Sequence, residues 1–99
     1  MSYLVAQISI HDRDIYNKYS EGFYDVFKKY NGEIVLVDEE PSLIEGSWEH
    51  TRMVIIRFPD DTEFYRWYNS PGYQKLAELR WKASESNLVL VKDKRSKSK

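Results

Sequence analysis

The stretch RMVIIRF, residues 52–58, decides the fold that this sequence predicts, and Pro59 ends it. Its near-continuous run of apolar and β-branched residues is typical of a strand that is buried on both faces. Residues 3–10 predict another strand, because apolar residues alternate there with a period of two. Residues 33–39 and 87–91 are similarly rich in Val, Ile and Leu and predict the remaining two strands.

The segment between the first two strands predicts a helix. Its apolar residues recur at helical spacing, and either Asp12 or Asp14 supplies a carboxylate that accepts the first free amide protons. Asn31-Gly32 is predicted to end this helix, because glycine and asparagine are common just after a last helical turn. One helix is therefore predicted to form most of the segment between the first two strands.

The segment after residue 59 contains two helical starts. Asp60 or Asp61 is predicted to cap a short helix. Ser70-Pro71 then combines a capping hydroxyl with a proline at the first helical position, and this helix is predicted to run to about residue 84. Both starts belong to a single helical region between the third and fourth strands.

The predicted order is strand, helix, strand, strand, helix, strand. This order fits an α+β, ferredoxin-like fold, in which a four-stranded antiparallel sheet carries two helices on one face. The other face would expose a large apolar patch, which is unusual for a monomer. We therefore predict a twofold homodimer that packs sheet against sheet. The patch would contain Val5, Val35 or Ile34, alternate residues of 52–58, and Val89 or Leu90.

Length and composition describe one globular domain. The chain has 99 residues, of which 41% are hydrophobic and 31% charged, and these values exclude a disordered protein. No apolar run is long enough to span a bilayer, and the N-terminus lacks the basic and apolar regions of a secretory signal. The absence of cysteine excludes disulfides and thiolate sites, so a cytoplasmic location is expected.

The C-terminal end differs in charge from the rest of the chain. Residues 92–99 hold five basic side chains and one acidic one, whereas the remaining residues are acidic overall. We expect residues 1–92 to form the domain and residues 93–99 to be a basic, disordered tail. Because the acidic domain opposes binding to phosphates, neither nucleic acid nor membrane is expected as a partner.

Several separated motifs resemble the uncharacterised DUF1330 family of the dimeric α+β barrel superfamily. The resemblance covers about residues 3–92. It implies a ferredoxin-like protomer and a homodimer that encloses a barrel, but no agreed activity, substrate or catalytic residue. The motifs are Glu45-Gly46, Trp48, Arg52, residues 54–59, Trp67-Tyr68, Ser70-Pro71, Tyr73-Gln74 and Arg80.

Two arginines stand among apolar residues and are candidate binding groups. The guanidinium of Arg52, at the start of a predicted buried strand, could hold a carboxylate or enolate oxygen through two hydrogen bonds. It could instead pair with Glu45 or Glu49 and fix the register of the strands. Arg80 shares a helix face with Tyr73, and a Glu45–Arg80 pair would be either an internal brace or part of a ligand site.

Proton-transfer candidates are few. His50 lies close in sequence to Trp48 and Arg52, and either His50 or a tyrosine such as Tyr68 could move a proton near a bound ligand. Trp48 and Tyr68 could also line a pocket, although most aromatics are expected to fill the core. No metal-ligand spacing or glycine-rich phosphate loop is present, so no metal or cofactor is expected.

The leading hypothesis is a homodimer that binds a small anionic or aromatic organic molecule. Its pocket would lie between the sheet and the second helix or the arm before residue 52, lined by Arg52, Arg80, Glu45, Trp48 and Tyr68. One alternative is a cofactor-independent oxygenase, isomerase or decarboxylase, in which Arg52 steadies an oxyanion. Another is a structural or regulatory dimerisation module without a ligand. A cavity that contains Arg52 favours binding, whereas a cavity filled by aromatic side chains favours the module.

Overall fold

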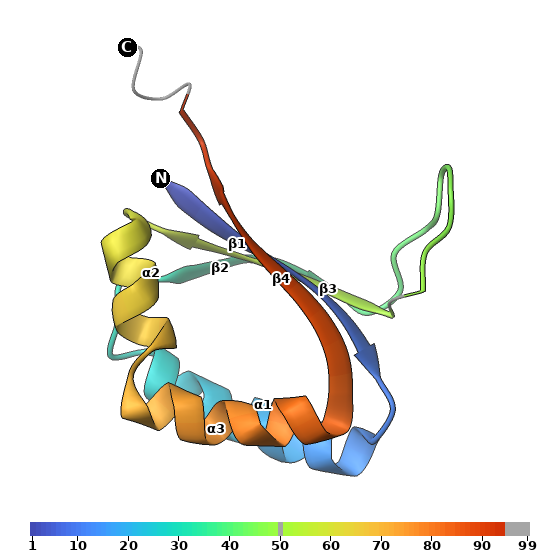
Figure 1. The fold of residues 1–99 in the computed structure, drawn as a ribbon, viewed down its shortest axis with the longest axis horizontal. Helices are drawn as coiled ribbons and strands as arrows, with labels where there is room; N and C mark the ends of the chain where they lie inside the picture. The colour runs from blue at the N-terminus through green and yellow to red at the C-terminus, as the bar shows by residue number, and fades with distance from the viewer. Residues whose placement is uncertain (50, 95–99) are drawn as a thin grey trace.

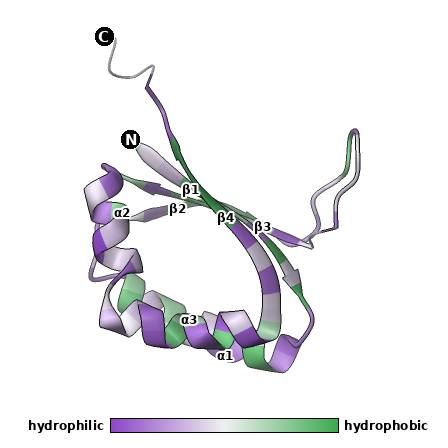
Figure 2. Ribbon diagram, viewed as in Figure 1, coloured by the Kyte–Doolittle hydropathy of each residue, from purple (hydrophilic) through white to green (hydrophobic). Residues whose placement is uncertain are grey.

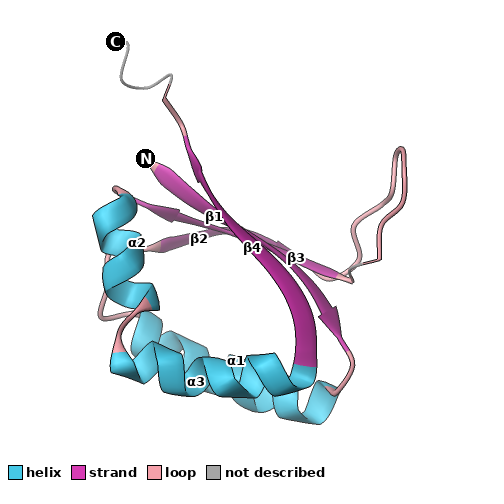
Figure 3. Cartoon of the chain, in the orientation of Figure 1, coloured by secondary structure: helices cyan, strands magenta, loops and turns pink. Residues whose placement is uncertain are grey.

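The computed structural model describes residues 1–49 and 51–94, which form one sheet and three helices (Figures 1 and 3). All strand pairs are antiparallel, and the strands lie in the order β2-β3-β1-β4. This arrangement confirms the predicted α+β fold and its four-stranded antiparallel sheet. The elements are β1 (Ser2–Ile10), α1 (Arg13–Phe27), β2 (Glu33–Asp38), β3 (Arg52–Phe58), α2 (Asp61–Tyr68), α3 (Pro71–Ala83) and β4 (Ser84–Lys92).

The helices cover one face of the curved sheet. The long helices α1 and α3 lie side by side across that face, and α2 lies at one end of it (Figure 1). The core fills the layer between sheet and helices, and its largest fully buried side chains are Trp67, Tyr16, Tyr73 and Phe58. An aromatic layer of this kind excludes water over a large area. None of the three helices in residues 1–49 and 51–94 lies on the opposite face of the sheet (Figure 1).

The helical region between β3 and β4 has both of the helix starts that the sequence predicts. It contains two helices, because the chain stops at Asn69 and starts again at Ser70. The Ser70 hydroxyl donates to the carbonyl of Trp67 at 2.7 Å and accepts from the amide of Tyr73 at 3.2 Å. One hydroxyl therefore ends α2 and caps α3, and Pro71 occupies the first turn of α3 as expected.

The end of α1 differs from the prediction. The helix ends at Phe27, before Asn31-Gly32, and Gly32 has no left-handed backbone. A Cβ on Gly32 would lie 2.6 Å from the ring of Phe27 and 2.8 Å from that of Phe58. Glycine is needed here because two buried rings approach the backbone, and not because it ends a helix.

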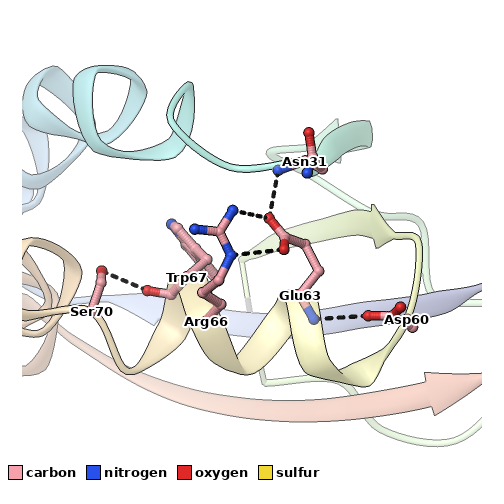
Figure 4. A network of polar contacts seen from close by, with 6 residues as sticks. All are labelled: Asn31, Asp60, Glu63, Arg66, Trp67 and Ser70. Atoms are coloured by element: carbon pink, nitrogen blue, oxygen red, sulfur yellow. Dashed lines mark hydrogen bonds and ion pairs between the residues drawn. The ribbon is translucent and has the colours of Figure 1, made fainter.

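A polar network fixes the position of α2 (Figure 4). Asp60 accepts from the amide of Glu63 at 2.9 Å and caps the helix. The Glu63 carboxylate accepts from the backbone amide of Asn31 and from two nitrogens of Arg66, at 2.8–2.9 Å. These hydrogen bonds lower the pKa of Glu63, with the contribution of Arg66 the largest. The carboxylate thus ties α2 to the turn after α1 and sets the direction of Trp67 on the same helix.

Strand register separates the two faces of the sheet. Leu4 pairs with Ile56 and Leu90, and this row faces the helices. The adjacent row, Leu36, Ile55, Val5 and Val89, crosses all four strands on the open face. A bulge between Ile34 and Leu36 shifts the register of β2. Of the alternatives left open by the sequence, Val89 therefore lies on the open face, whereas Ile34 and Leu90 face the helices.

Some predictions fall on residues that the structure does not describe. His50 lies outside the described residues, and so do residues 95–99 of the expected tail. The C-terminal half of β4 is strongly apolar, as Figure 2 shows. Within the described residues, no helix combines the length and the apolar character needed to cross a membrane.

Candidate functional site

A cavity of about 130 Å³ lies between the sheet and helices α1 and α3. Its sheet wall is aliphatic, with Leu4, Ala6 and Ile8 of β1 and neighbouring residues of the other strands. Its helix wall is mainly aromatic. The lining side chains that carry polar atoms include Tyr16, Tyr19, Arg52, Trp67, Tyr73 and Arg80. Polar groups in so apolar a layer need partners, and those partners define what the cavity can bind.

Arg80 is the most deeply placed charge at this cavity. It lies near the end of α3, and only 4% of its surface is exposed. One terminal nitrogen donates to the hydroxyl of Ser86 at 2.9 Å, and the guanidinium carbon lies 6.0 Å from the ring centre of Tyr19. No acidic side chain in residues 1–49 or 51–94 forms an ion pair with it. The cavity therefore borders a buried positive charge without a negative partner.

The pKa of Arg80 keeps it charged. Burial alone would lower the pKa of the guanidinium, but the neighbouring tyrosines Tyr73 and Tyr19 outweigh this effect, and the pKa is raised. Arg80 is thus a cation at any pH at which the protein is folded.

Arg52 stands at the first position of β3 and lines the cavity from a second side. Its guanidinium lies over the ring of Tyr16, at 5.5 Å from the ring centre, and forms an ion pair with Glu39. Its side chain is 18% exposed, and that of Glu39 is 56% exposed. Arg52 therefore extends from the cavity to the outer surface, and the carboxylate of Glu39 balances its positive charge.

Two tyrosine hydroxyls meet in the helix wall. The Tyr19 and Tyr73 oxygens lie 2.7 Å apart and share one hydrogen bond. Burial, and then the neighbouring Tyr73, raise the pKa of Tyr19 well above its usual value. Burial also raises the pKa of Tyr16, although Arg52 and Arg80 oppose that rise. Tyr16 and Tyr19 are therefore neutral near pH 7, where each can donate a hydrogen bond but is a poor base.

Three buried donors at the cavity lack a hydrogen-bond partner in the described part of the chain. They are the Nε atoms of Arg52 and Arg80 and the indole Nε1 of Trp67. Guanidinium and indole nitrogens can only donate, so none of them can satisfy another. Because unpaired buried donors are costly, a hydrogen-bond acceptor placed at these three atoms would be stabilised.

The structure brings together only some of the predicted site residues. Arg52 and Arg80 both line the cavity. Tyr68 does not line the cavity. Its ring is stacked on that of Phe64, with ring centres 5.5 Å apart. Glu45 and Trp48 belong to the arm between β2 and β3, which projects away from the helices (Figure 1), and neither lines the cavity.

The predicted ion pairs of these residues are wrong. Arg52 pairs with Glu39 and not with Glu45 or Glu49, and Arg80 does not pair with Glu45. Glu45 is exposed on the arm, because Gly46 turns the chain there with a φ of 88°. The number of residues between Glu45 and Arg52 does not indicate how far this arm extends from the sheet.

Sequence reasoning did not identify Tyr16 and Tyr19 as site residues, although both lie in the cavity wall. Tyr19 belongs to the stripe of α1 residues that recur at helical spacing toward the core, and Tyr16 directly follows Ile15 of the same stripe. The available signal was chemical, because tyrosine hydroxyls inside an apolar stripe need partners. Together with an arginine on the facing helix, they point to a polar site within the core.

The Tyr19 hydroxyl should make the protein sensitive to alkali. Above pH 10 the unfolded chain loses its phenolic protons, whereas folded Tyr19 keeps its own, so the free energy of unfolding should fall as pH rises. Tyr19→Phe should reduce this fall by about 1 kcal/mol between pH 10 and 11, since a proton bound only in the folded state lowers the free energy of unfolding by about 1.4 kcal/mol per pH unit. Urea unfolding between pH 8 and 11 measures it. Equal slopes for the two proteins would contradict the assignment.

The whole domain matches one protein family. A family model described as "Domain of unknown function (DUF1330)" matches residues 1–93. The chain belongs to the DUF1330 family. The family suggested by the sequence motifs is thereby confirmed, and a DUF1330 domain covers every element described above. No curated protein matches the chain in sequence.

Solved structures resemble this DUF1330 domain in fold. A Rhodopseudomonas palustris protein of unknown function, RPA0582, has a TM-score of 0.78 and 16% identity over 93% of this chain and 81% of its own. SnoaB from Streptomyces nogalater, a cofactor-independent oxygenase, has a TM-score of 0.66 and 18% identity over 93% of this chain and 91% of its own. At such identities the likeness establishes the fold alone.

A further neighbour supports the ferredoxin-like description of the DUF1330 domain. A Bacteroides fragilis protein of unknown function, described as dimeric and ferredoxin-like, has a TM-score of 0.62 and 10% identity over 93% of this chain and 95% of its own. The α+β, ferredoxin-like fold predicted from the strand and helix order is therefore confirmed. The dimeric state belongs to that neighbour.

Proposed function

We propose that the cavity binds a small, planar organic anion. The observation that carries this proposal is the set of buried donors without acceptors, with Arg80 at its centre. Arg80 is 4% exposed and has no acidic partner among the described residues, so an anion would complete both its charge and its hydrogen bonds. A carboxylate or an enolate oxygen has the required charge and geometry.

The size and walls of the cavity suggest the rest of the ligand. Its volume of about 130 Å³ is close to that of cavities of roughly 150 Å³ that hold one benzene ring. Aromatic side chains such as Tyr16 and Phe23 face aliphatic side chains of the sheet across this space. A flat ring or a short conjugated chain fits between such walls and buries its apolar surface there.

The alternatives are less well supported. A dimerisation module without a ligand would be expected to fill the space with aromatic side chains, but the space is open and contains charge. A cofactor-independent oxygenase remains an analogy with SnoaB, which shares the fold. Such chemistry needs a base, and the raised pKa values of Tyr16 and Tyr19 argue against these phenols in that role.

Binding of benzoate and benzamide tests the proposal. The two molecules have nearly the same shape, and only benzoate is charged. We expect benzoate to bind at least tenfold more tightly, because a tenfold ratio corresponds to about 1.4 kcal/mol and a hydrogen bond to a charged group contributes about 1.5–3 kcal/mol. Calorimetry and chemical-shift titration measure both affinities. Equal binding of the two, or no binding of benzoate, would reject an anion site.

We further propose that this domain, residues 1–92, works as a cytoplasmic homodimer. The open face of the sheet carries the apolar row of Leu36, Ile55, Val5 and Val89, in which Leu36 is 44% and Val89 56% exposed. A second copy that covers this face would remove the row from water in both protomers. The helix-covered cavity would then lie on the outer side of each sheet.

Val89→Lys tests the dimer. Since Val89 is half exposed in one protomer, we expect the variant to fold, while two lysines at a twofold interface would repel each other. Sedimentation should show the unmodified protein as a dimer at micromolar concentration and the variant as a monomer. Tyr24→Lys is the control, because Tyr24 is 66% exposed on α1 and lies on the other side of the molecule. A monomeric unmodified protein would refute the dimer.

A further inference from the structure

The two arginines of the cavity differ in their electrostatic state. Arg52 forms an ion pair with Glu39, so this pair adds no net charge to the site. Among the described residues, Arg80 donates to the neutral hydroxyl of Ser86 and lies over the ring of Tyr19, and it forms no ion pair. The cavity thus offers one uncompensated positive charge, although two guanidinium groups line it.

Strand register explains how Glu39 reaches Arg52. Asp38 pairs with Met53 at the end of the β2–β3 ladder, so the next residues along the two strands, Glu39 and Arg52, are cross-strand neighbours. Glu39 itself does not line the cavity. Its carboxylate neutralises the cavity arginine from the outer, solvent-exposed side.

We propose that Glu39 restricts the cavity to ligands with a single negative charge. This inference rests on the proposed anion site and specifies which anions that site selects. A monoanion places its charge at Arg80 and leaves the Glu39–Arg52 pair intact. A dianion must bring its second charge to Arg52, where it competes with Glu39 and is repelled by it. Glu39 is therefore a specificity-determining residue that need not touch the ligand.

Two observations favour selection over a purely structural role. The Arg52 Nε is buried and has no hydrogen-bond partner in the described residues, so the guanidinium retains a donor on its covered side. The guanidinium also lies on Tyr16, a wall of the same cavity. A pair that only fixed strand register would not require one partner to line a cavity.

A matched pair of probes separates charge from shape. Isophthalate carries two carboxylates, and 3-carbamoylbenzoate replaces one of them by an amide of nearly the same shape. We expect the unmodified protein to prefer 3-carbamoylbenzoate. Glu39→Gln keeps the length of the side chain but removes its charge, and it should shift the affinity ratio toward isophthalate by about fivefold to tenfold. Calorimetry at low ionic strength measures the four affinities.

The control is Glu40→Gln, which removes the same charge one residue further along, where the side chain is exposed and forms no ion pair with Arg52. It should leave the ratio unchanged, which excludes a general effect of net charge. An unchanged ratio in Glu39→Gln overturns the inference even if benzoate binds. Failure of benzoate itself to bind overturns the proposed anion site, so the two proposals can fail separately.

Discussion

Arg80→Met should make the protein more stable and at the same time remove anion binding. Methionine matches the length of the aliphatic part of arginine and leaves no charge among the surrounding tyrosines. Replacing a buried ion pair by apolar side chains of similar volume is often stabilising by about 1–4 kcal/mol, because the charges no longer have to be removed from water. We expect the free energy of unfolding to rise by about 1–3 kcal/mol, because Arg80 has no acidic partner to lose in the described structure.

The loss of binding should be large. Without Arg80, benzoate would enter an apolar cavity with no uncompensated positive charge, so its affinity should fall at least tenfold and approach that of benzamide. Urea unfolding gives the stability and calorimetry gives the affinity of the same preparation. Opposite changes in the two quantities are typical of a residue that serves function at the expense of stability.

A surface arginine provides the control for this experiment. Arg13→Met makes the same chemical change at an exposed position of α1, and both stability and benzoate affinity should stay nearly constant. If Arg80 were an internal brace, Arg80→Met would instead lower the free energy of unfolding. That result would support a structural role for Arg80 and weaken the case for a ligand.

The fold could be predicted from the sequence because its signals are local. The apolar run of β3, the alternation in β1 and the Ser70-Pro71 helix start each act within a few residues. The end of α1 could not be located as well. The sequence predicts Gly32 as a helix-ending residue, but its role depends on two rings that reach it from α1 and β3.

The candidate site was predictable only in part. Arginine in an apolar pattern is a strong signal, and both Arg52 and Arg80 line the cavity. Their partners were not predictable. Strand register places Glu39 beside Arg52, whereas Glu45 lies on the arm, which projects away from the helices (Figure 1). Charge pairing depends on distances of a few ångströms between segments, and residue types alone do not determine such distances.

Gly32→Ala should destabilise the protein strongly for a substitution that adds one methyl group. The new Cβ would lie 2.6 Å from an atom of the Phe27 ring and 2.8 Å from an atom of the Phe58 ring, well inside van der Waals contact. Neither ring can move freely. Phe58 is fully buried and lies 5.6 Å from Trp67, and Phe27 also lies 5.6 Å from Trp67, with all distances taken between ring centres.

The added methyl group should therefore displace side chains from the turn after α1 as far as Trp67 in the cavity wall. Overpacking a dense core typically costs about 1–3 kcal/mol, and we expect Gly32→Ala to lower the free energy of unfolding by that amount. Gly72→Ala is the matched control, because its Cβ would lie 3.7 Å from Val26, an ordinary contact, and alanine favours the helix. The control should be as stable as the unmodified protein or slightly more so in urea unfolding. If Gly32→Ala is equally stable, the rings must have room to yield, and Gly32 is then not required by their approach.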